Sequence, residues 1–510
     1  MARRYNILLI TGDHTRHDAV AANLDPLGTS SIARVLQTPN VDRLVAQGVT
    51  FSNSYTTNPI CVPARASITT GNYSHKCTGV KNNGGRIGDD QPKIAAHFAA
   101  RGYATYACGK LHYVPYSPPG EPRLVHGFQS VDLCESGRIL AKFDPLGERT
   151  GLEDYHDYLA SVGWRGYDRA HGIGNNDVHP AASPLPAEHH EESWVAGRTI
   201  ARLKEHVRTR PAQPFLMWAS FAKPHSPYDP PRPWDAMYDP RSVPPPLGGW
   251  ENEHLMEGRD LELRRRRPRY GWDKLSAEAV QVCRAFYCGM ISFQDFQIGR
   301  ILSCLDETGL ADSTIIVYTA DHGDLLGDFG RFFKVSMFDG SVKVPLVWRA
   351  PGVTPESGPR KREQFVGSHD ILPTLCALTG CELPCAVDGE DLTPVLRDPR
   401  APGRQFMVSQ CMDPPQQKYM LRTAEWKYVY TEIGGIEELY DVRREDCELL
   451  NLAGDPTCRS VLEEHRSLLV RWCEENGDGK MVQAGRLAVS PEDVLPPAEF
   501  SAGSMGWRKH

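Results

Sequence analysis

Residues 6–11 read Asn6-Ile7-Leu8-Leu9-Ile10-Thr11, an apolar run of strand length, and Gly12 and Asp13 follow it directly. A short run without polar alternation is typical of a strand that is buried on both faces of a parallel sheet. Because such sheets carry helices on both faces, the run predicts an α/β fold. Further runs of this kind, which we predict to be parallel core strands, occupy residues 103–107, 215–221, 314–320 and 344–348.

Helical patterns separate these runs, which supports the same fold class. Residues 92–101 begin with Pro92 and are followed by Gly102, and helices commonly have proline at the start and glycine just past the end. Residues 280–307 carry apolar side chains at three- and four-residue spacing. Ligands of open α/β sheets bind at the carboxyl ends of the strands. Since Asp13 and Asp321 directly follow two of the predicted strands, we expect both carboxylates at the same edge of the sheet.

The sequence pattern changes along the chain and predicts three parts. Residues 113–190 and 226–275 are rich in proline and charge, and we predict that these insertions shape a binding pocket. Farther on, short strand patterns in series precede a helical pattern. The three parts are a catalytic domain of residues 1–395, a small C-terminal α+β domain of residues 396–480 with a short antiparallel sheet, and a tail of residues 481–510 that is a candidate contact in a homo-oligomer.

The overall composition argues against several functional classes. The chain carries a net charge of −7 from 57 basic and 64 acidic side chains, whereas nucleic-acid binding needs a strongly basic face. The N-terminal apolar run is too short for a secretory signal, and the chain lacks the ~18 consecutive apolar residues that a membrane span needs. We therefore expect a cytoplasmic protein without membrane or nucleic-acid partners, whose fourteen cysteines are mostly reduced thiols.

The pentapeptide Cys61-Val62-Pro63-Ala64-Arg65 is the most specific motif in the chain. Taken alone, it fits a buried cysteine on a turn before a helix equally well. Its weight comes from other motifs that occur in a fixed order. After NILLI and DHTR near the N-terminus, these are TPNVDRL (38–44), GKLH (109–112), HGF (126–128), KPHSP (223–227), TADHGD (319–324), HDILPTL (369–375), WKY (426–428) and ELYD (438–441).

This ordered set resembles the formylglycine-dependent sulfatases, the type I sulfatase family of the alkaline-phosphatase-like superfamily. The resemblance spans most of the chain. It implies a mostly parallel sheet sandwiched by helices, with a smaller C-terminal α+β domain. It also implies hydrolysis of a sulfate monoester, from a small molecule or a carbohydrate, to an alcohol and inorganic sulfate. A formylglycine-generating enzyme is the implied partner that oxidises Cys61 to formylglycine.

The resemblance further implies one divalent metal ion. Its ligands would be Asp13, His14, Asp321, His322 and the oxygens of formylglycine at Cys61. Hard cations take oxygen ligands, so Ca²⁺ is the expected ion. Many relatives have Asp at the position of His14, and an imidazole there makes Mn²⁺ the alternative. A second interpretation of His14 is a hydrogen bond to a ligand instead of a bond to the metal.

The family's chemistry assigns further roles by resemblance. One hydroxyl of hydrated formylglycine 61 attacks sulfur while Asp321 accepts its proton. His225 then protonates the leaving alcohol, and His112 removes the proton of the second hydroxyl so that sulfate departs. Positive charge around the sulfate stabilises the transition state. The residues that supply this charge are Arg65, Lys110 and Lys334.

Two weaker features have competing interpretations. Asn83 is a candidate contact for the substrate, but a turn residue beside Gly84 is the slightly favoured interpretation. The arginine run 264–267 could gather an anionic sugar sulfate, but a solvated loop is the favoured interpretation. Three other histidines follow no predicted strand within a motif, and we predict that they are structural. They are His75, His97 and His156.

Two alternative functions remain. A phosphonate monoester or phosphodiester hydrolase of the same superfamily shares the fold, the formylglycine and an Asp-His metal pair. His14 and His322 favour this alternative, whereas Lys110 and His112 argue against it. A non-catalytic scaffold should have lost Cys61, a metal carboxylate or Lys334, and all are present. Carbohydrate sulfates, choline sulfate and simple alkyl or aryl sulfates all remain candidate substrates.

Overall fold

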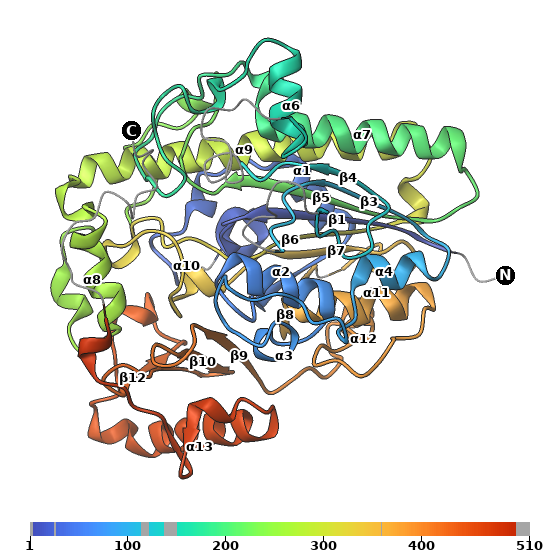
Figure 1. Ribbon diagram of the computed structural model, residues 1–510. Helices are drawn as coiled ribbons and strands as arrows, with labels where there is room; N and C mark the ends of the chain where they lie inside the picture. Colours follow the sequence, from blue (N-terminus) through green and yellow to red (C-terminus); the bar gives the residue numbers. More distant parts are fainter. Residues whose placement is uncertain (1–3, 25–26, 114–121, 137–149, 359, 496–510) are drawn as a thin grey trace.

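The structure, a computed structural model, describes residues 4–24, 27–113, 122–136, 150–358 and 360–495. A large sheet with helices on both faces forms the main body, and a smaller sheet with one long helix lies beside it (Figure 1). Parts of the predicted insertion 113–190 and of the predicted tail 481–510 lie outside the described residues. No helix within the described ranges is both long enough and apolar enough to cross a membrane.

The central sheet has eight strands among the described residues, in the order β4-β3-β5-β1-β6-β7-β2-β8. Strand β1 lies in the middle and pairs in parallel with β5 and β6, so that Leu8 lies between Met217 and Ile316. The strands are β1 Asn6–Asp13, β2 Val49–Tyr55, β3 Ala104–Gly109, β4 Ser130–Leu133, β5 Phe215–Pro224, β6 Thr314–Ala320, β7 Leu346–Arg349 and β8 Lys361–Gly367.

Four of the five predicted strands are parallel as expected, but the fifth is not. Strand β7 pairs antiparallel with both β6 and β2, so the prediction of a parallel strand at residues 344–348 was wrong. A parallel neighbour needs a crossover connection that carries the chain back along the sheet. The segment between β6 and β7 contains only the short helices η10 Asp328–Gly330 and α10 Asp339–Val342, and its residues contribute to the site described below.

Alternate side chains of β1 enter two different hydrophobic cores, which explains its continuous apolar run. Ile7 and Leu9 pack in one core with residues of α2, α4 and α11. Leu8 and Ile10 pack in the other with residues of α1, α7 and α9. The first group comprises α2 Cys61–Thr70, α4 Ile94–Ala99 and α11 Ile371–Thr379, and the second comprises α1 Pro39–Gln47, α7 Glu191–Thr209 and α9 Ala277–Glu307. The predicted fold class, a mostly parallel sheet between helices, is confirmed.

The C-terminal part forms a separate antiparallel sheet in the order β12-β11-β10-β9. Its strands are β9 Phe406–Cys411, β10 Lys418–Thr423, β11 Trp426–Thr431 and β12 Ile436–Asp441. Helix α13, Arg459–Glu475, covers one face through Leu469 and Trp472. The opposite face packs on the main body, where Met407 and Met420 share a core with Tyr55 and Leu325. The predicted short antiparallel sheet of the small C-terminal α+β domain is thereby confirmed.

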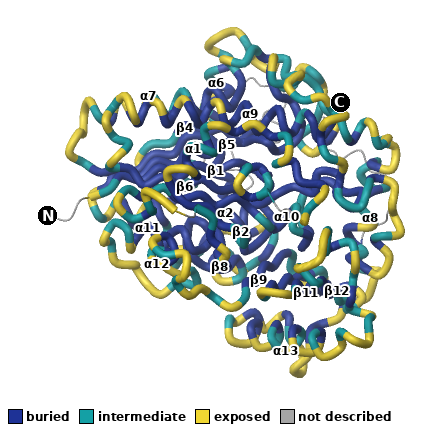
Figure 2. The backbone as a smooth tube through the Cα atoms, turned by 180° about the vertical axis from the view of Figure 1, so that it is seen from behind, coloured by how far each residue is buried: buried dark blue, intermediate teal, exposed yellow. Residues whose placement is uncertain are grey.

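The insertion at residues 226–275 is folded and packs on the main body. Helix α8, Leu261–Arg269, contains the arginine run 264–267, so the interpretation of this run as a loop was wrong. Residues of the predicted tail also pack closely, because the Tyr430 hydroxyl donates to the Ala488 carbonyl at 2.9 Å. Figure 2 shows that the exposed surface follows the outer sides of helices and loops, whereas the central strands are buried throughout.

Candidate active site

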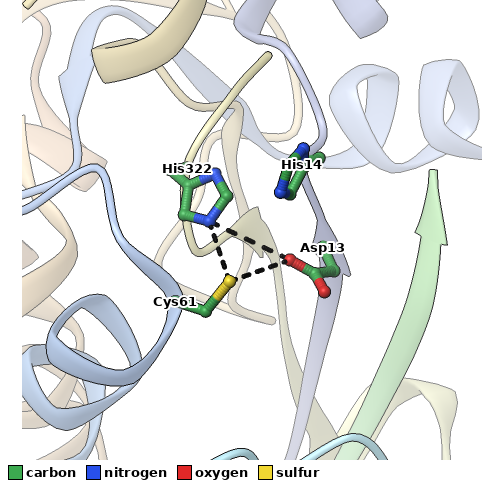
Figure 3. Close-up of side chains that lie close together, drawn as sticks. All are labelled: Asp13, His14, Cys61 and His322. Atoms are coloured by element: carbon green, nitrogen blue, oxygen red, sulfur yellow. Dashed lines mark hydrogen bonds and ion pairs between the residues drawn. The ribbon is translucent and has the colours of Figure 1, made fainter. Parts of the chain in front are cut away.

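Four buried side chains converge at the carboxyl ends of β1 and β6 (Figure 3). Asp13 ends β1 after a shift in register with β5, and His14 has a left-handed backbone at φ 66°. Cys61 is the first residue of α2, and His322 lies two residues beyond β6. One ligand atom from each residue lies within 4.8 Å of the other three.

The donors in this cluster suit a divalent metal. The Cys61 sulfur lies 3.3 Å from His322 Nε2 and 3.7 Å from Asp13 Oδ1, and the His14 and His322 ring centroids are 4.5 Å apart. One carboxylate, two imidazoles and one sulfur converge at this point. Imidazole nitrogens are common ligands of divalent transition metals, and a carboxylate suits Mn²⁺. The residues present therefore fit the implied metal.

Asp321 lies beside this cluster, and other groups bind both of its oxygens. Its Oδ2 accepts a hydrogen bond from Arg65 Nε at 3.0 Å. Its Oδ1 accepts from the backbone N–H of His14 at 3.3 Å and of His322 at 3.0 Å. Burial and the nearby Asp13 carboxylate raise the pKa of Asp321, against the opposing charges of His322 and Arg65. The carboxylate therefore also orients the backbone that carries the two histidines.

Lys334 and Lys110 contact residues of the cluster, and Arg65, the third cation proposed from the sequence, contacts Lys110. Lys334 Nζ lies 2.8 Å from the Cys61 sulfur and 2.5 Å from His14 Nε2, and Lys110 forms an ion pair with Asp13. Arg65 donates to the Lys110 carbonyl at 2.9 Å. Burial alone would raise the pKa of Cys61, but Lys334, Lys110 and His322 hold it well below its usual value. The site thus stabilises negative charge at residue 61.

The two predicted acid–base histidines reach the same cluster. The His225 ring centroid lies 4.1 Å from that of His14. His225 Nδ1 is 2.8 Å from the Ser226 carbonyl, which can only accept, so Nδ1 carries a proton and Nε2 is the atom able to exchange one. His112 forms a side-chain hydrogen bond with Cys61, and its backbone N–H donates to Glu135 at 2.8 Å.

The remaining sequence candidates have other contacts. Asn83 is exposed, and its Oδ1 accepts a hydrogen bond from the Val62 N–H at 3.2 Å, at the start of α2. Its contact with substrate therefore stays a prediction. His75, His97 and His156 lie outside the four-residue cluster, which agrees with structural roles. His97, for example, lies 3.4 Å from the Cys376 sulfur.

Comparison with known proteins identifies the family of the chain. The sulfatase family model matches residues 5–381, which is more than half of the chain. The chain belongs to the sulfatase family. A second model, the C-terminal part of N-sulphoglucosamine sulphohydrolase, matches residues 327–475 of this sulfatase. The predicted family is therefore confirmed, and the protein is a hydrolase.

Known relatives cover nearly the whole sulfatase. An arylsulfatase of Clostridium perfringens is 28% identical over 93% of this chain and 95% of its own length. The multifunctional alkaline phosphatase superfamily protein PehA of Trinickia caryophylli is also 28% identical, over 93% of this chain and 96% of its own length. The crystal structure of a phosphonate monoester hydrolase of Agrobacterium radiobacter matches with a TM-score of 0.77 and 25% identity, over 93% of this chain and 96% of the other.

The structure also reveals a residue to which the sequence reasoning assigned no role. Asp324 Oδ2 lies 2.8 Å from His14 Nδ1 and orients this imidazole toward the cluster. Its Oδ1 accepts from the N–H groups of Leu326 and Phe333, both at 2.8 Å. The only sequence signal was its place in the motif TADHGD, three residues after Asp321. Glu135, which accepts a hydrogen bond from the His112 N–H, is a second residue without an assigned role, because it lies outside every sequence motif.

Proposed function

We propose that this sulfatase cleaves a sulfate monoester through formylglycine formed from Cys61, with a divalent metal at the adjacent cluster. The observation that carries the proposal is the position of Cys61. Its sulfur lies between Lys334 Nζ, at 2.8 Å, and His322 Nε2, at 3.3 Å. When present, the metal supplies Lewis-acid charge, and formylglycine supplies a hydrated aldehyde as the nucleophile. The natural substrate would be a small-molecule or carbohydrate sulfate ester.

The metal would be held by Asp13, His14 and His322, with residue 61 completing the set and Asp321 beside it. Ca²⁺ is the ion implied by resemblance, and Mn²⁺ is the alternative. The two imidazoles of the cluster favour Mn²⁺, because Ca²⁺ takes oxygen ligands. Asp324 binds Nδ1 of His14, so the lone pair of Nε2 faces the cluster and would bind the ion in place of its present contact with Lys334 Nζ.

The other side chains provide charge and move protons. Lys334 and Lys110 lie on two sides of the cluster, where their ammonium groups would stabilise the sulfate oxygens as negative charge develops. Arg65 fixes both the Asp321 carboxylate and the Lys110 main chain. His225 would protonate the leaving alcohol through Nε2. His112, in hydrogen-bond contact with residue 61, would accept a proton there.

A decisive experiment combines mass spectrometry with kinetics. We expect the Cys61 peptide of protein made together with a formylglycine-generating enzyme to show the mass of the aldehyde. That protein should hydrolyse 4-nitrophenyl sulfate, and Cys61→Ala should lose this activity by several orders of magnitude. Cys77→Ala, at another buried thiol, is the matched control and should retain activity. Full activity of purified Cys61→Ala would exclude the mechanism.

Phosphonate monoester hydrolysis is the second candidate function. The structural similarity to the Agrobacterium radiobacter enzyme favours it. A sulfate monoester and a phosphonate monoester each carry one negative charge, so the cations around residue 61 do not by themselves discriminate between them. Lys110 and His112, in the motif GKLH, favour the sulfate. We expect kcat/KM to be higher for 4-nitrophenyl sulfate than for 4-nitrophenyl phenylphosphonate. A large preference for the phosphonate would instead identify a phosphonate monoester hydrolase.

Other expectations from the sequence stay predictions. They are the cytoplasmic location, the homo-oligomeric state, the boundaries of the three parts of the chain, and the absence of nucleic-acid partners. All fourteen cysteines lie in the described ranges, and none of them is paired with another.

A further inference from the structure

Lys334 is held in an unusual stretch of backbone. The residues on either side of it, Phe333 at φ 68° and Val335 at φ 67°, both have left-handed conformations. This region is sterically unfavourable for bulky side chains and most of all for β-branched valine. Such conformations are strained and persist only where the surroundings enforce them. Contacts elsewhere in the molecule must therefore hold this backbone in place.

Two cations from distant parts of the chain provide those contacts. Arg266, on α8 of the insertion, donates from Nη1 to the carbonyl of Lys334 at 2.7 Å. Lys418, on β10 of the C-terminal sheet, donates from Nζ to the carbonyl of Val335 at 3.1 Å. The Val335 N–H in turn donates to the carbonyl of Pro59, two residues before Cys61. The segment that carries Lys334 is thus bound from three sides.

A buried carboxylate joins the two cations. Glu262 accepts from Arg266 Nε at 2.7 Å and from Lys418 Nζ at 2.9 Å. A second carboxylate, Asp260, pairs with Lys418 at 2.5 Å. Burial alone would raise the pKa of Glu262, but Arg266 and Lys418 lower it to about 2, so the carboxylate stays charged. Buried ion clusters add little stability over apolar packing. A role in fixing geometry therefore explains this one better.

We propose that Arg266 is a positioning residue for Lys334. Glu262 and Lys418 hold the Arg266 side chain and the backbone next to Lys334 in place. This inference rests on the proposed function, because it needs Lys334 to act on the substrate. It gives the arginine run of the insertion a role at the active site that differs from collection of anionic substrate. The C-terminal sheet, through Lys418, would then also help to position the Lys334 side chain.

The experiment is a double-mutant cycle on kcat/KM for 4-nitrophenyl sulfate. Arg266→Gln should lower kcat about tenfold to a hundredfold with little change in KM, because small displacements of a catalytic group cost rate. In a Lys334→Ala background, the same substitution should change kcat less than about twofold, since coupled residues are non-additive. Arg264→Gln, an exposed residue of the same helix, is the control and should leave both backgrounds unchanged.

Two further measurements separate positioning from folding and maturation. Arg266→Lys keeps the charge beside Glu262 but loses the planar fork, so its kcat should fall between those of the wild type and Arg266→Gln. This variant also serves if Arg266→Gln does not fold. Formylglycine content at residue 61 should be equal in all variants.

The outcomes are distinguishable. An equal loss of kcat with and without Lys334 would overturn the positioning role while the proposed function stands. An unchanged rate in Lys334→Ala alone would show that Lys334 does not act on the substrate, and a wild type with full formylglycine that hydrolyses neither aryl, choline nor carbohydrate sulfates would contradict the proposed function itself. The positioning role would then fall with it.

Discussion

At the scale of single residues, the site depends on side chains that need not touch the metal. Asp324 binds the nitrogen of His14 that faces away from the cluster, and it also accepts two backbone N–H groups. Groups in this position fix the tautomer and direction of a metal-binding imidazole. Sequence reasoning found His14 but not Asp324, because the function of Asp324 depends on a contact between the ends of two different strands.

Substitution of Asp324 should weaken metal binding. In Asp324→Asn, the amide N–H₂ would face His14 Nδ1 and disturb its orientation, and we expect the affinity for Mn²⁺ or Ca²⁺ to fall about 10- to 100-fold. Calorimetric titration of the metal-free protein with each ion measures this directly. Asp312→Asn, at a side chain that is 90% exposed, is the control. Equal dissociation constants in Asp324→Asn and wild type would show that His14 does not need this partner.

His156 should make stability fall with rising pH. It lies 3.3 Å from Glu153 and 3.1 Å from Asp168. Burial alone would lower its pKa, but these carboxylates raise it to about 10, above the ~6.5 of an unfolded chain. A raised pKa contributes stability that is complete below about pH 6.5 and is lost as the pH approaches 10.

Urea denaturation at pH 7 and pH 9.5 tests this expectation. The free energy of unfolding of the wild type should fall more between these pH values than that of His156→Gln. His254→Gln, at an exposed residue of the short helix η7, Glu253–Met256, should behave like the wild type. Identical pH slopes for wild type and His156→Gln would show that this ion cluster does not contribute as its contacts indicate.

At the scale of elements, the continuous apolar strands were predictable and the mixed ones were not. Strands β1, β3, β5 and β6 are buried along their whole length, so their sequences contain an unmistakable apolar run. Strand β8 has exposed and half-buried polar residues, and sequence reasoning did not identify it. The direction of β7 was also unpredictable, because direction depends on the connection and not on the side chains of the strand.

The end of β3 is a point where only glycine fits. Gly109 has φ 104°, and a Cβ there would collide with the Ser220 carbonyl, which also accepts the N–H of Lys110 at 2.9 Å. Gly109→Ala should therefore push β3 away from β5 and displace Lys110. We expect lower thermal stability together with a loss of aryl sulfatase activity greater than the stability change explains.

Gly102→Ala provides a matched control for this prediction. Gly102 has a similar left-handed backbone at φ 85°, but its surroundings leave room for a Cβ. It should show only the cost of the conformation, roughly 1 kcal/mol, and normal kinetics. If Gly109→Ala unfolds at the same temperature as Gly102→Ala and remains active, the close approach of β3 to β5 is not required.

At the scale of the whole molecule, the main body and the C-terminal sheet share an extensive interface. Besides the core around Met420, the interface contains buried ion pairs. Lys81 of the main body donates to Tyr419 of β10 at 2.6 Å and pairs with Asp478 at 3.1 Å. The sequence predicted two kinds of fold along the chain. It could not predict this coupling, because each partner alone is an ordinary charged residue.

The two parts should therefore unfold together. Differential scanning calorimetry should show one transition, and Lys81→Met should lower its midpoint by several degrees, because Asp478 would remain buried without its cation. Lys480→Met, at a nearby exposed lysine, should leave the midpoint unchanged. Two separate transitions, with only one shifted by Lys81→Met, would indicate independent domains.

The contacts of Lys334 also have a consequence for chimeric enzymes. Its backbone is bound by Arg266 from the insertion and by Lys418 from the C-terminal sheet, and Glu262 joins these two residues. Grafting the insertion of another sulfatase onto this protein, in search of new substrates, would replace Arg266 and Glu262 but keep Lys418. The two segments should be inherited as a pair, although more than a hundred residues separate them in the gene.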